Sequence, residues 1–376
     1  MRRICIFMSM VTALSVNAWE PNCRNKETPK AFEQGDAGLG NAVGIGSPYP
    51  ARVNLSDSYN TFGTISYLYW FAGEDALDLG TTAQFNGQVV GLVPNLPVST
   101  TIFQPNKYSS GFKLGAGYEL PTDDWVIRAD YTRFHQTTSQ TRSADFGGAD
   151  PVIQLTNWFY QVSPSRSQTP GVKSLSSKWH LSLDWVDLVL ERPFYIGRRL
   201  TATPFMGLRS SWITQTVVLE VSGITNFSSP PASAKSYNTS HAWAIGPRFG
   251  LDGRFLLGLG IRFQGALAGT LLYNNFTHTK HHEDTLFPNN PASQPYTFLN
   301  KNDSCVRTMA EANLGLGWGM YFGNAYHLDV SATYDFNYLP EQNQIRVLND
   351  IQIDGINATA MALYLHGLTV TTAFNF

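Results

Sequence analysis

The chain of 376 residues has few charged side chains and no long apolar run. Charged residues make up 14%, and the formal net charge is only −2. A near-neutral balance argues against nucleic acid as a partner, because nucleic-acid binding depends on an excess of positive charge. No stretch of about 18 uncharged apolar residues occurs, which excludes a protein that crosses a membrane with helices.

Cysteines are also scarce, and one of the three, Cys5, lies in a segment with the features of a secretion signal. Arg2 and Arg3 form a basic start, an apolar run follows, and Ala18 ends a small-x-small cleavage pattern. We expect residues 1–18 to be a signal peptide that is removed, which leaves Cys23 and Cys305. Two isolated thiols, one disulfide and intermolecular bridges are all open for these two cysteines.

Aromatic residues, in contrast, are abundant at 13%. With so few charges beside them, this frequency favours a chain with a lipid-facing girdle over a cytosolic enzyme. Mean hydropathy is −0.16, a value typical of soluble proteins. Membrane β-barrels give a similar value because lipid-facing apolar and lumen-facing polar side chains alternate along their strands and cancel in the average.

The clearest alternation lies near the C-terminus. From Ala312 to Phe322, and again from Tyr326 to Tyr338, every second residue is apolar and most residues between are polar or glycine. These runs predict strands longer than the about 5 to 6 residues typical of globular proteins. They match the about 9 to 11 residues that cross a membrane. Phe322 and Tyr326 share a face only if they sit opposite each other, so residues 323–325 are predicted to form a hairpin loop.

The same criterion predicts ten strands along the chain, at 60–71, 109–120, 125–138, 176–191, 199–218, 240–255, 259–274, 307–322, 326–340 and 361–376. Short connections (121–124, 192–198, 256–258, 323–325) alternate with long ones (72–108, 139–175, 219–239, 275–306, 341–360). Outer-membrane barrels have short periplasmic turns and long extracellular loops. The predicted fold class is therefore all-β, a transmembrane antiparallel up-and-down β-barrel of about ten strands over residues 60–376. Residues 85–93 and 153–162 are candidate further strands, so twelve or more is open, with the total even.

Two terminal features complete this domain organisation. Residues 19–59 are rich in Gly, Pro, Asn and Ser, and are predicted to be a periplasmic arm or a segment inserted into the lumen. At the other end, Phe374 and Phe376 lie on the apolar face of the last alternating stretch. They resemble the assembly signal of bacterial outer-membrane barrels, which implies recognition by the outer-membrane assembly machinery.

Charged residues on the polar faces are predicted to line the lumen: Lys113, Glu119, Arg128, Asp130, Asp184, Arg209, Arg248, Asp252, Arg254, Arg262, Glu311, Asp329 and Asp335. On 176–191 the assignment treats Trp179 and Trp185 as lipid-facing, which places Asp184 inside. In a water-filled pore such residues set ion preference by their local fields. In a narrow barrel they pair and fill it instead. Both readings are open, and the balanced signs predict weak ion selectivity for a pore.

Other motifs give no site. His278, His281 and His282 are weak metal candidates, but a solvated polar loop is favoured because nothing fixes their geometry. His135 and His180 fall near predicted strand rims, where no catalytic partner at a fixed spacing can be identified. No Gly-x-Ser-x-Gly elbow occurs. We expect no cofactor, no metal and no enzymatic activity.

Four ordered stretches resemble the Legionella-type major outer membrane protein family, which is similar in kind to chlamydial major outer membrane proteins. They are LYWFAGEDAL at 68–77, PFMGLRSSW at 204–212, GPRFGLD at 246–252 and LHGLT at 365–369. Ala76 stands where the first stretch is expected to have Gly. The resemblance covers about residue 60 to the end, and the family carries no catalytic motif to transfer.

The resemblance implies a pore-forming, surface-exposed protein of the bacterial outer membrane. We expect porin-like passive diffusion of small solutes or ions. The alternative is a structural or adhesive barrel with a filled lumen that acts through its extracellular loops. Expected partners are outer-membrane lipid, the assembly machinery and small solutes, with a second copy of the chain or a host surface left open.

Overall fold

The computed structural model describes residues 59–84, 100–121, 123–145, 151–161, 171–196, 199–224, 233–287, 290–322, 326–353 and 361–376. The predicted signal peptide, nearly all of the predicted N-terminal arm and Cys23 lie outside these residues. Cys305 has no disulfide partner among the described residues. No helix in this part of the chain is long and apolar enough to span a membrane.

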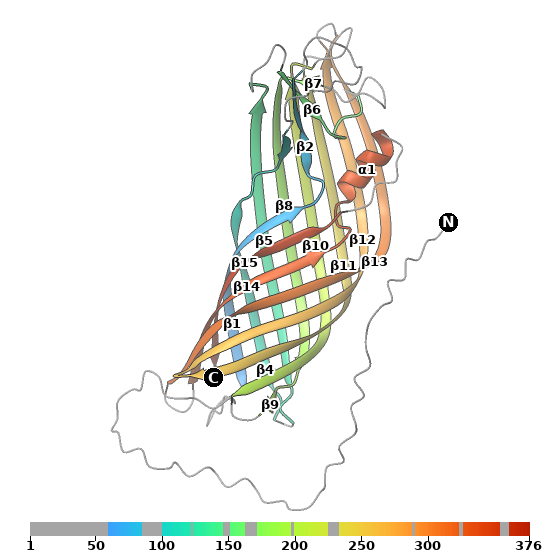
Figure 1. The fold of residues 1–376 in the computed structure, drawn as a ribbon. Helices are drawn as coiled ribbons and strands as arrows, with labels where there is room; N and C mark the ends of the chain where they lie inside the picture. Colours follow the sequence, from blue (N-terminus) through green and yellow to red (C-terminus); the bar gives the residue numbers. More distant parts are fainter. Residues whose placement is uncertain are drawn as a thin grey trace, which may run out of the picture. The chain divides into compact units, whose positions relative to one another are not determined.

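Ten antiparallel strands close into a barrel (Figure 1). Each pairs with the strands before and after it in the ring, and the ring closes where β15 pairs with β1. A short eleventh strand, β9 (Phe194–Ile196), adds only to β10. The barrel strands are β1 (Thr61–Glu74), β4 (Tyr108–Glu119), β5 (Val126–Ser143), β8 (Ser174–Glu191), β10 (Leu200–Ser222), β11 (Ser233–Gly258), β12 (Ile261–Phe287), β13 (Asn290–Phe322), β14 (Tyr326–Leu339) and β15 (Leu363–Asn375).

The predicted barrel of ten strands is confirmed, and the short connections share one end of it. Phe322 pairs with Tyr326, as the alternation predicted. The turn between β11 and β12 is tight, and Leu259 (φ 56°) and Gly260 (φ 78°) both adopt left-handed backbone there. The two chain ends of the barrel meet at the same end, where the Thr61 and Phe376 backbones exchange two hydrogen bonds of 3.0 and 3.3 Å.

Two of the predicted long loops are instead largely strand. β12 and β13 continue to Phe287 and from Asn290, so they run through most of the predicted loop 275–306. β10 and β11 likewise shorten the predicted loop 219–239. Beyond the apolar band both faces of these strands carry polar side chains, so the two-residue hydrophobic period that marks a strand disappears although the pairing continues.

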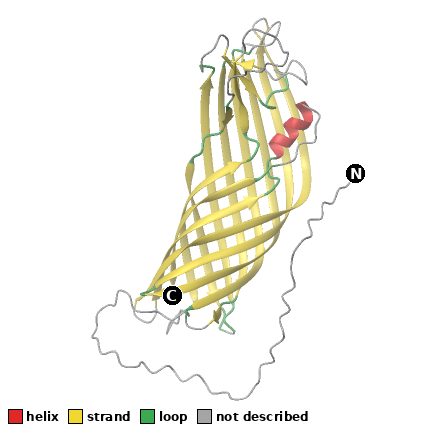
Figure 2. Ribbon diagram, viewed as in Figure 1, coloured by secondary structure: helices red, strands yellow, loops and turns green. Residues whose placement is uncertain are grey.

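The remaining long connections fold into a second, four-stranded sheet and one helix (Figure 2). The sheet contains β2 (Asp78–Gln84), β3 (Thr101–Phe103), β6 (Pro151–Leu155) and β7 (Gly171–Val172). The candidate strand at 153–162 is therefore partly a strand but belongs to this sheet, and 85–93 lies outside the described residues. Helix α1 (Gln344–Ile353) begins where Asn343 Oδ1 accepts the backbone N–H of Arg346 at 3.0 Å, an N-cap contact.

The outer face of the barrel is apolar over most strands. Ile65, Leu267 and Leu316 are 67%, 67% and 54% exposed, as expected for side chains that face lipid. The inner face has two zones. Near the short turns it is polar, whereas toward the long loops inward side chains form one apolar cluster with residues of the second sheet and with Ile345 of α1.

Candidate functional site

A cavity of about 610 Å³ occupies the polar zone of the lumen. Twelve of the thirteen charged residues predicted to face the lumen line it: Lys113, Glu119, Arg128, Asp130, Arg209, Arg248, Asp252, Arg254, Arg262, Glu311, Asp329 and Asp335. They come from seven of the barrel strands, because the two-residue period brings one face of each strand to the same interior.

Asp184 is the exception, and the lumenal position predicted for it is wrong. The side chains of β8 that face the interior are those of Trp179, Trp185 and Asp187, each 2% exposed. Leu188, on the opposite face, is 52% exposed. Asp184 shares the outward face and accepts a 2.6 Å hydrogen bond from the Tyr131 hydroxyl. The prediction failed because alternation separates the two faces of a strand but does not say which apolar face meets lipid and which meets an apolar interior.

The lumenal charges are paired. Arg209 contacts Asp187 of the neighbouring strand and Glu311 of β13, with N–O distances of 2.6 Å in both cases. Since β11 and β12 separate β10 from β13, the contact with Glu311 bridges the lumen. Arg248 joins the same carboxylate at 2.9 Å. Asp187 was missed by sequence reasoning, because β8 was assigned with its faces reversed.

Further pairs lie nearer the short turns. Arg262 of β12 holds Asp329 of β14 in a two-point ion pair. Arg128 contacts Asp130 and Glu191, both with N–O distances of 3.0 Å. The attraction within such pairs offsets part of the large desolvation cost of placing many charges in a narrow lumen.

An aromatic and polar layer crosses the lumen at the inner boundary of the cavity. The rings of Trp70 on β1 and Trp185 on β8 lie 6.4 Å apart, although β4 and β5 separate their strands in the wall. The Arg209 guanidinium lies 4.7 Å from the Trp185 ring centroid. On the long-loop side of the tryptophan pair, Gln136 Oε1 accepts the backbone N–H of Ala72 at 2.9 Å, and Gln136 Nε2 donates to the backbone carbonyl of Ala72 at 2.7 Å. This layer, together with the apolar cluster beyond it, fills the lumen on the side of the long loops.

Comparison with known families identifies the barrel. The family described as Legionella pneumophila major outer membrane protein precursor matches residues 60–376. The chain belongs to this family. It is therefore a protein of the bacterial outer membrane, and its lipid-facing band, short periplasmic turns and extracellular long loops follow the architecture of such barrels.

Solved structures give weaker likenesses. The outer membrane protease OmpT from Escherichia coli matches at 11% identity and a TM-score of 0.40, over 85% of this chain and 97% of that one. A major outer membrane protein from Thermus thermophilus matches at 8% identity and a TM-score of 0.29, over 84% and 99%. A comparison with curated proteins gives no match. The assignment rests on the family match.

In this outer-membrane barrel, the extracellular filling is fastened to the wall by a buried carboxylate. Glu283 of β12 is fully buried and accepts the backbone N–H groups of Tyr160 and Gln161, the latter at 2.9 Å. His281 Nε2 donates to Glu283 Oε1 at 2.9 Å, and His281 Nδ1 forms a hydrogen bond of 2.7 Å with the Asn238 side chain. The segment after β6 is thereby held inside the extended strands.

The three weak metal candidates do not come together. His281 is buried and faces inward, whereas His282 contacts Thr297 and His278 stacks on His241 with ring centroids 4.2 Å apart. Among the described residues, no group of His, Cys, Asp or Glu is placed to hold a metal ion.

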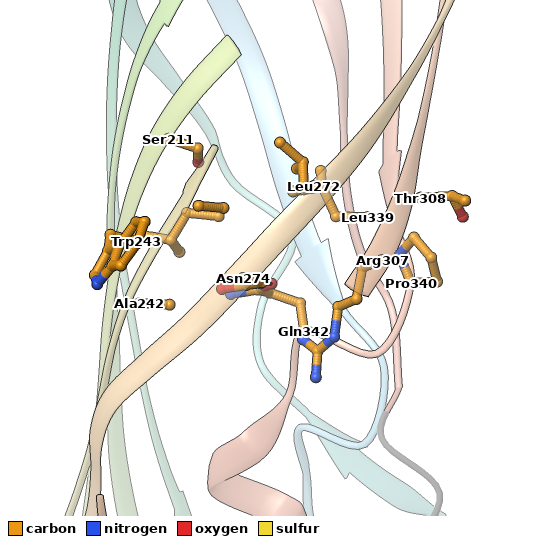
Figure 3. Close-up of a pocket in the computed structure, with 12 residues that line it drawn as sticks. Ser211, Ala242, Trp243, Leu272, Asn274, Arg307, Thr308, Leu339, Pro340 and Gln342 are labelled. Carbon is orange, nitrogen blue, oxygen red and sulfur yellow. Dashed lines mark hydrogen bonds between the residues drawn. The ribbon is translucent and has the colours of Figure 1, made fainter. Parts of the chain in front are cut away.

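A second, much smaller cavity lies where β10 to β13 meet the segment after β14 (Figure 3). Figure 3 shows Asn274, Arg307 and Gln342 close together there, with Leu272 and Leu339 on the same cavity. Its volume of about 10 Å³ has room for one water molecule and no solute. The lumenal cavity is therefore the candidate functional site.

Proposed function

We propose that this barrel is a narrow outer-membrane channel for small polar solutes or ions, closed in its resting state by the layer around Trp70 and Trp185. The observation that carries the proposal is the polar lumenal cavity of about 610 Å³, which lies against that layer. A barrel with a purely structural role has no need of a cavity of this size lined by ten strands. No catalytic group is assigned, because passage requires none.

The charge pattern supports weak selectivity. Six cationic side chains and eight carboxylates line the cavity, and most are tied in pairs that neutralise one another at short range. A field made of such pairs discriminates little between cations and anions. We therefore expect passage to depend on solute size more than on solute charge.

Conductance in a planar lipid bilayer tests the proposal. The wild-type protein should give brief, discrete openings, and Trp185→Ala, which removes one side of the closing layer, should give long openings of the same barrel. Trp243→Ala is the matched control, because Trp243 faces outward on β11 and should leave the openings unchanged. If neither the wild type nor Trp185→Ala gives current, the channel is rejected, provided that both proteins are folded. A change in electrophoretic mobility on heating shows that each barrel is folded.

A second candidate is a structural or adhesive surface barrel with a permanently filled lumen. It is supported by β12 and β13, which continue well beyond β14. On the extended part of β13, Tyr296 and Phe298 form a ring cluster with Tyr160 of the segment after β6. Shortening this hairpin should then abolish binding to host cells while heat-modifiable mobility is kept. Phe376→Ser separately tests the predicted assembly signal, which should lower the amount of barrel inserted.

A further inference from the structure

The outer face of β5 and β8 carries a polar patch that begins close to the periplasmic end, whereas the outward side chains of β14 are apolar along its whole length. We define the basic patch as Lys107, Arg133, His135, Lys178 and His180. The exposed fraction of the Arg133 side chain is 49%, and Lys107 and Lys178 are also exposed. None of these residues contributes to the lumenal cavity. The patch therefore has no part in the channel proposed above.

Printed contacts join the patch into one surface. Arg133 Nε donates to His135 Nε2 at 3.2 Å, and the Ser182 hydroxyl contacts the same nitrogen at 3.1 Å. The rings of His135 and His180 meet edge to face, with centroids 6.2 Å apart.

Two lysines flank this centre. Lys107 Nζ donates to the Thr137 carbonyl at 3.4 Å, and the Thr137 hydroxyl bonds His180 at 2.8 Å. Lys178 lies on β8 opposite Ser139, one outward position beyond His180. Four of the five basic side chains therefore lie on the adjacent strands β5 and β8, and Lys107, which precedes β4, reaches the same surface through Thr137.

The position of the patch relative to the lipid-facing band is unusual. On β5 only Ile127, Ala129 and Tyr131 face outward before Arg133 is reached from the periplasmic end. On β14 the outward side chains are apolar all the way from Tyr326 to Tyr338. A lipid-facing band is normally about 25 Å high around the whole barrel. The basic patch therefore lies at or within the outer edge of the membrane, where bare charge is costly without a partner.

Charge identifies the partner. Of the three strong cations in the patch, only Arg133 has a carboxylate nearby in the described part of the chain, Asp184, and that carboxylate is closer to the Tyr131 hydroxyl at 2.6 Å than to Arg133 at 4.0 Å. Among the described residues, neither lysine forms an ion pair. We propose that the basic patch binds the phosphate groups of an outer-leaflet glycolipid. Arginine and lysine form short, charge-assisted hydrogen bonds to phosphate oxygens, and adjacent imidazole and hydroxyl groups supply further donors.

Binding of lipid A to the full-length protein in detergent tests this site. Bisphosphorylated lipid A should bind the wild type, and lipid A with both phosphates removed should bind much more weakly. Arg133→Gln combined with Lys178→Gln should weaken binding of the bisphosphorylated form by about tenfold or more, since two charged donors are lost. The matched control is Lys280→Gln with Lys301→Gln, two exposed lysines on the outer face of β12 and β13.

Native mass spectrometry reads out the bound lipid, and heat-modifiable mobility establishes that each variant is folded. Equal binding by wild type and patch variant, or binding that is indifferent to the phosphates, would overturn the proposal. So would a change from oligomer to monomer in the patch variant without lipid A, because the patch would then be a contact between copies of the chain. Channel conductance is independent of these outcomes.

Discussion

Trp70 and Trp185 meet across the lumen with ring centroids 6.4 Å apart, although two strands separate them in the barrel wall. The pair connects walls that no backbone hydrogen bond joins. It sets the boundary between the polar cavity and the apolar filling, so the closing layer depends on side chains that reach across the lumen.

The energy of this contact is measurable with a double-mutant cycle. Trp70→Ala and Trp185→Ala should each destabilise the barrel, and their effects should be coupled by about 0.5 to 1.5 kcal/mol, as for other aromatic pairs. Unfolding by guanidinium from lipid vesicles measures the free energies. Trp70→Ala combined with the outward Trp243→Ala should instead be additive, and equal coupling in both cycles would contradict a direct contact across the lumen.

Arg209 is expected to be the charge on which the lumenal network depends most. It is 2% exposed and holds Asp187, also 2% exposed, so Arg209→Gln leaves a buried carboxylate without its partner. The free energy of unfolding should fall by about 3 to 5 kcal/mol. Replacing the pair together, as Arg209→Met with Asp187→Leu, should recover much of this loss.

The contrasting variant is Arg254→Gln. Its guanidinium contacts Asp252 at 3.1 Å, but the side chain is 47% exposed. We expect a loss below about 1 kcal/mol, because solvent screens such pairs. Similar losses for Arg209→Gln and Arg254→Gln would mean that burial does not set the strength of these contacts.

The lipid-facing and lumen-facing sides of the wall at β14 and β15 should respond differently to the same charge. Val330→Arg places a cation in the lipid-facing band and should cost about 2 to 4 kcal/mol. Ala373→Arg places it on the neighbouring strand toward the cavity, opposite Asp329, where it should be tolerated. Folding titrations in vesicles compare the two, and equal destabilisation would show that the assignment of faces is wrong.

Glu283 is expected to hold the extracellular filling in place. In Glu283→Gln one of the two acceptor oxygens becomes an amide donor that faces a backbone N–H, so the segment at Tyr160 and Gln161 should loosen. Chymotrypsin should then cleave near Tyr160 faster than in the wild type. Asp284→Asn, on the outward face one residue further, is the control and should leave cleavage unchanged.

Most of the barrel was predictable from the chain, because lipid on one side and polar side chains on the other impose a strict two-residue period. β14 shows this best: its alternation gave the strand, its face and its partner position at Phe322. Twelve lumenal residues followed from the same rule. The hydrophobic period cannot identify a strand where both of its faces are polar. For this reason the extracellular ends of β12 and β13 were predicted to be loop.

β8 shows the second limit. Its apolar face from Trp179 to Trp185 packs against an interior built by the long loops and by β1, not against lipid. That interior is made by residues distant in sequence, so local alternation cannot distinguish it from a membrane. Because of the same reversal, Asp187 was not predicted to face the lumen. His135 and His180 were predicted near the rims of their strands with no identified partner, whereas they belong to the basic patch on the outer face.

The pairing of β15 with β1 has a kinetic consequence. It joins Thr61 to Phe376, residues 315 positions apart, and every other barrel hairpin is local by comparison. Bringing such distant segments together carries a large loop-closure entropy, and slow formation of non-local contacts is the general result. Sealing of this seam should therefore be the slowest step of maturation, and a sheet that is complete except for it should accumulate as an open, curled intermediate.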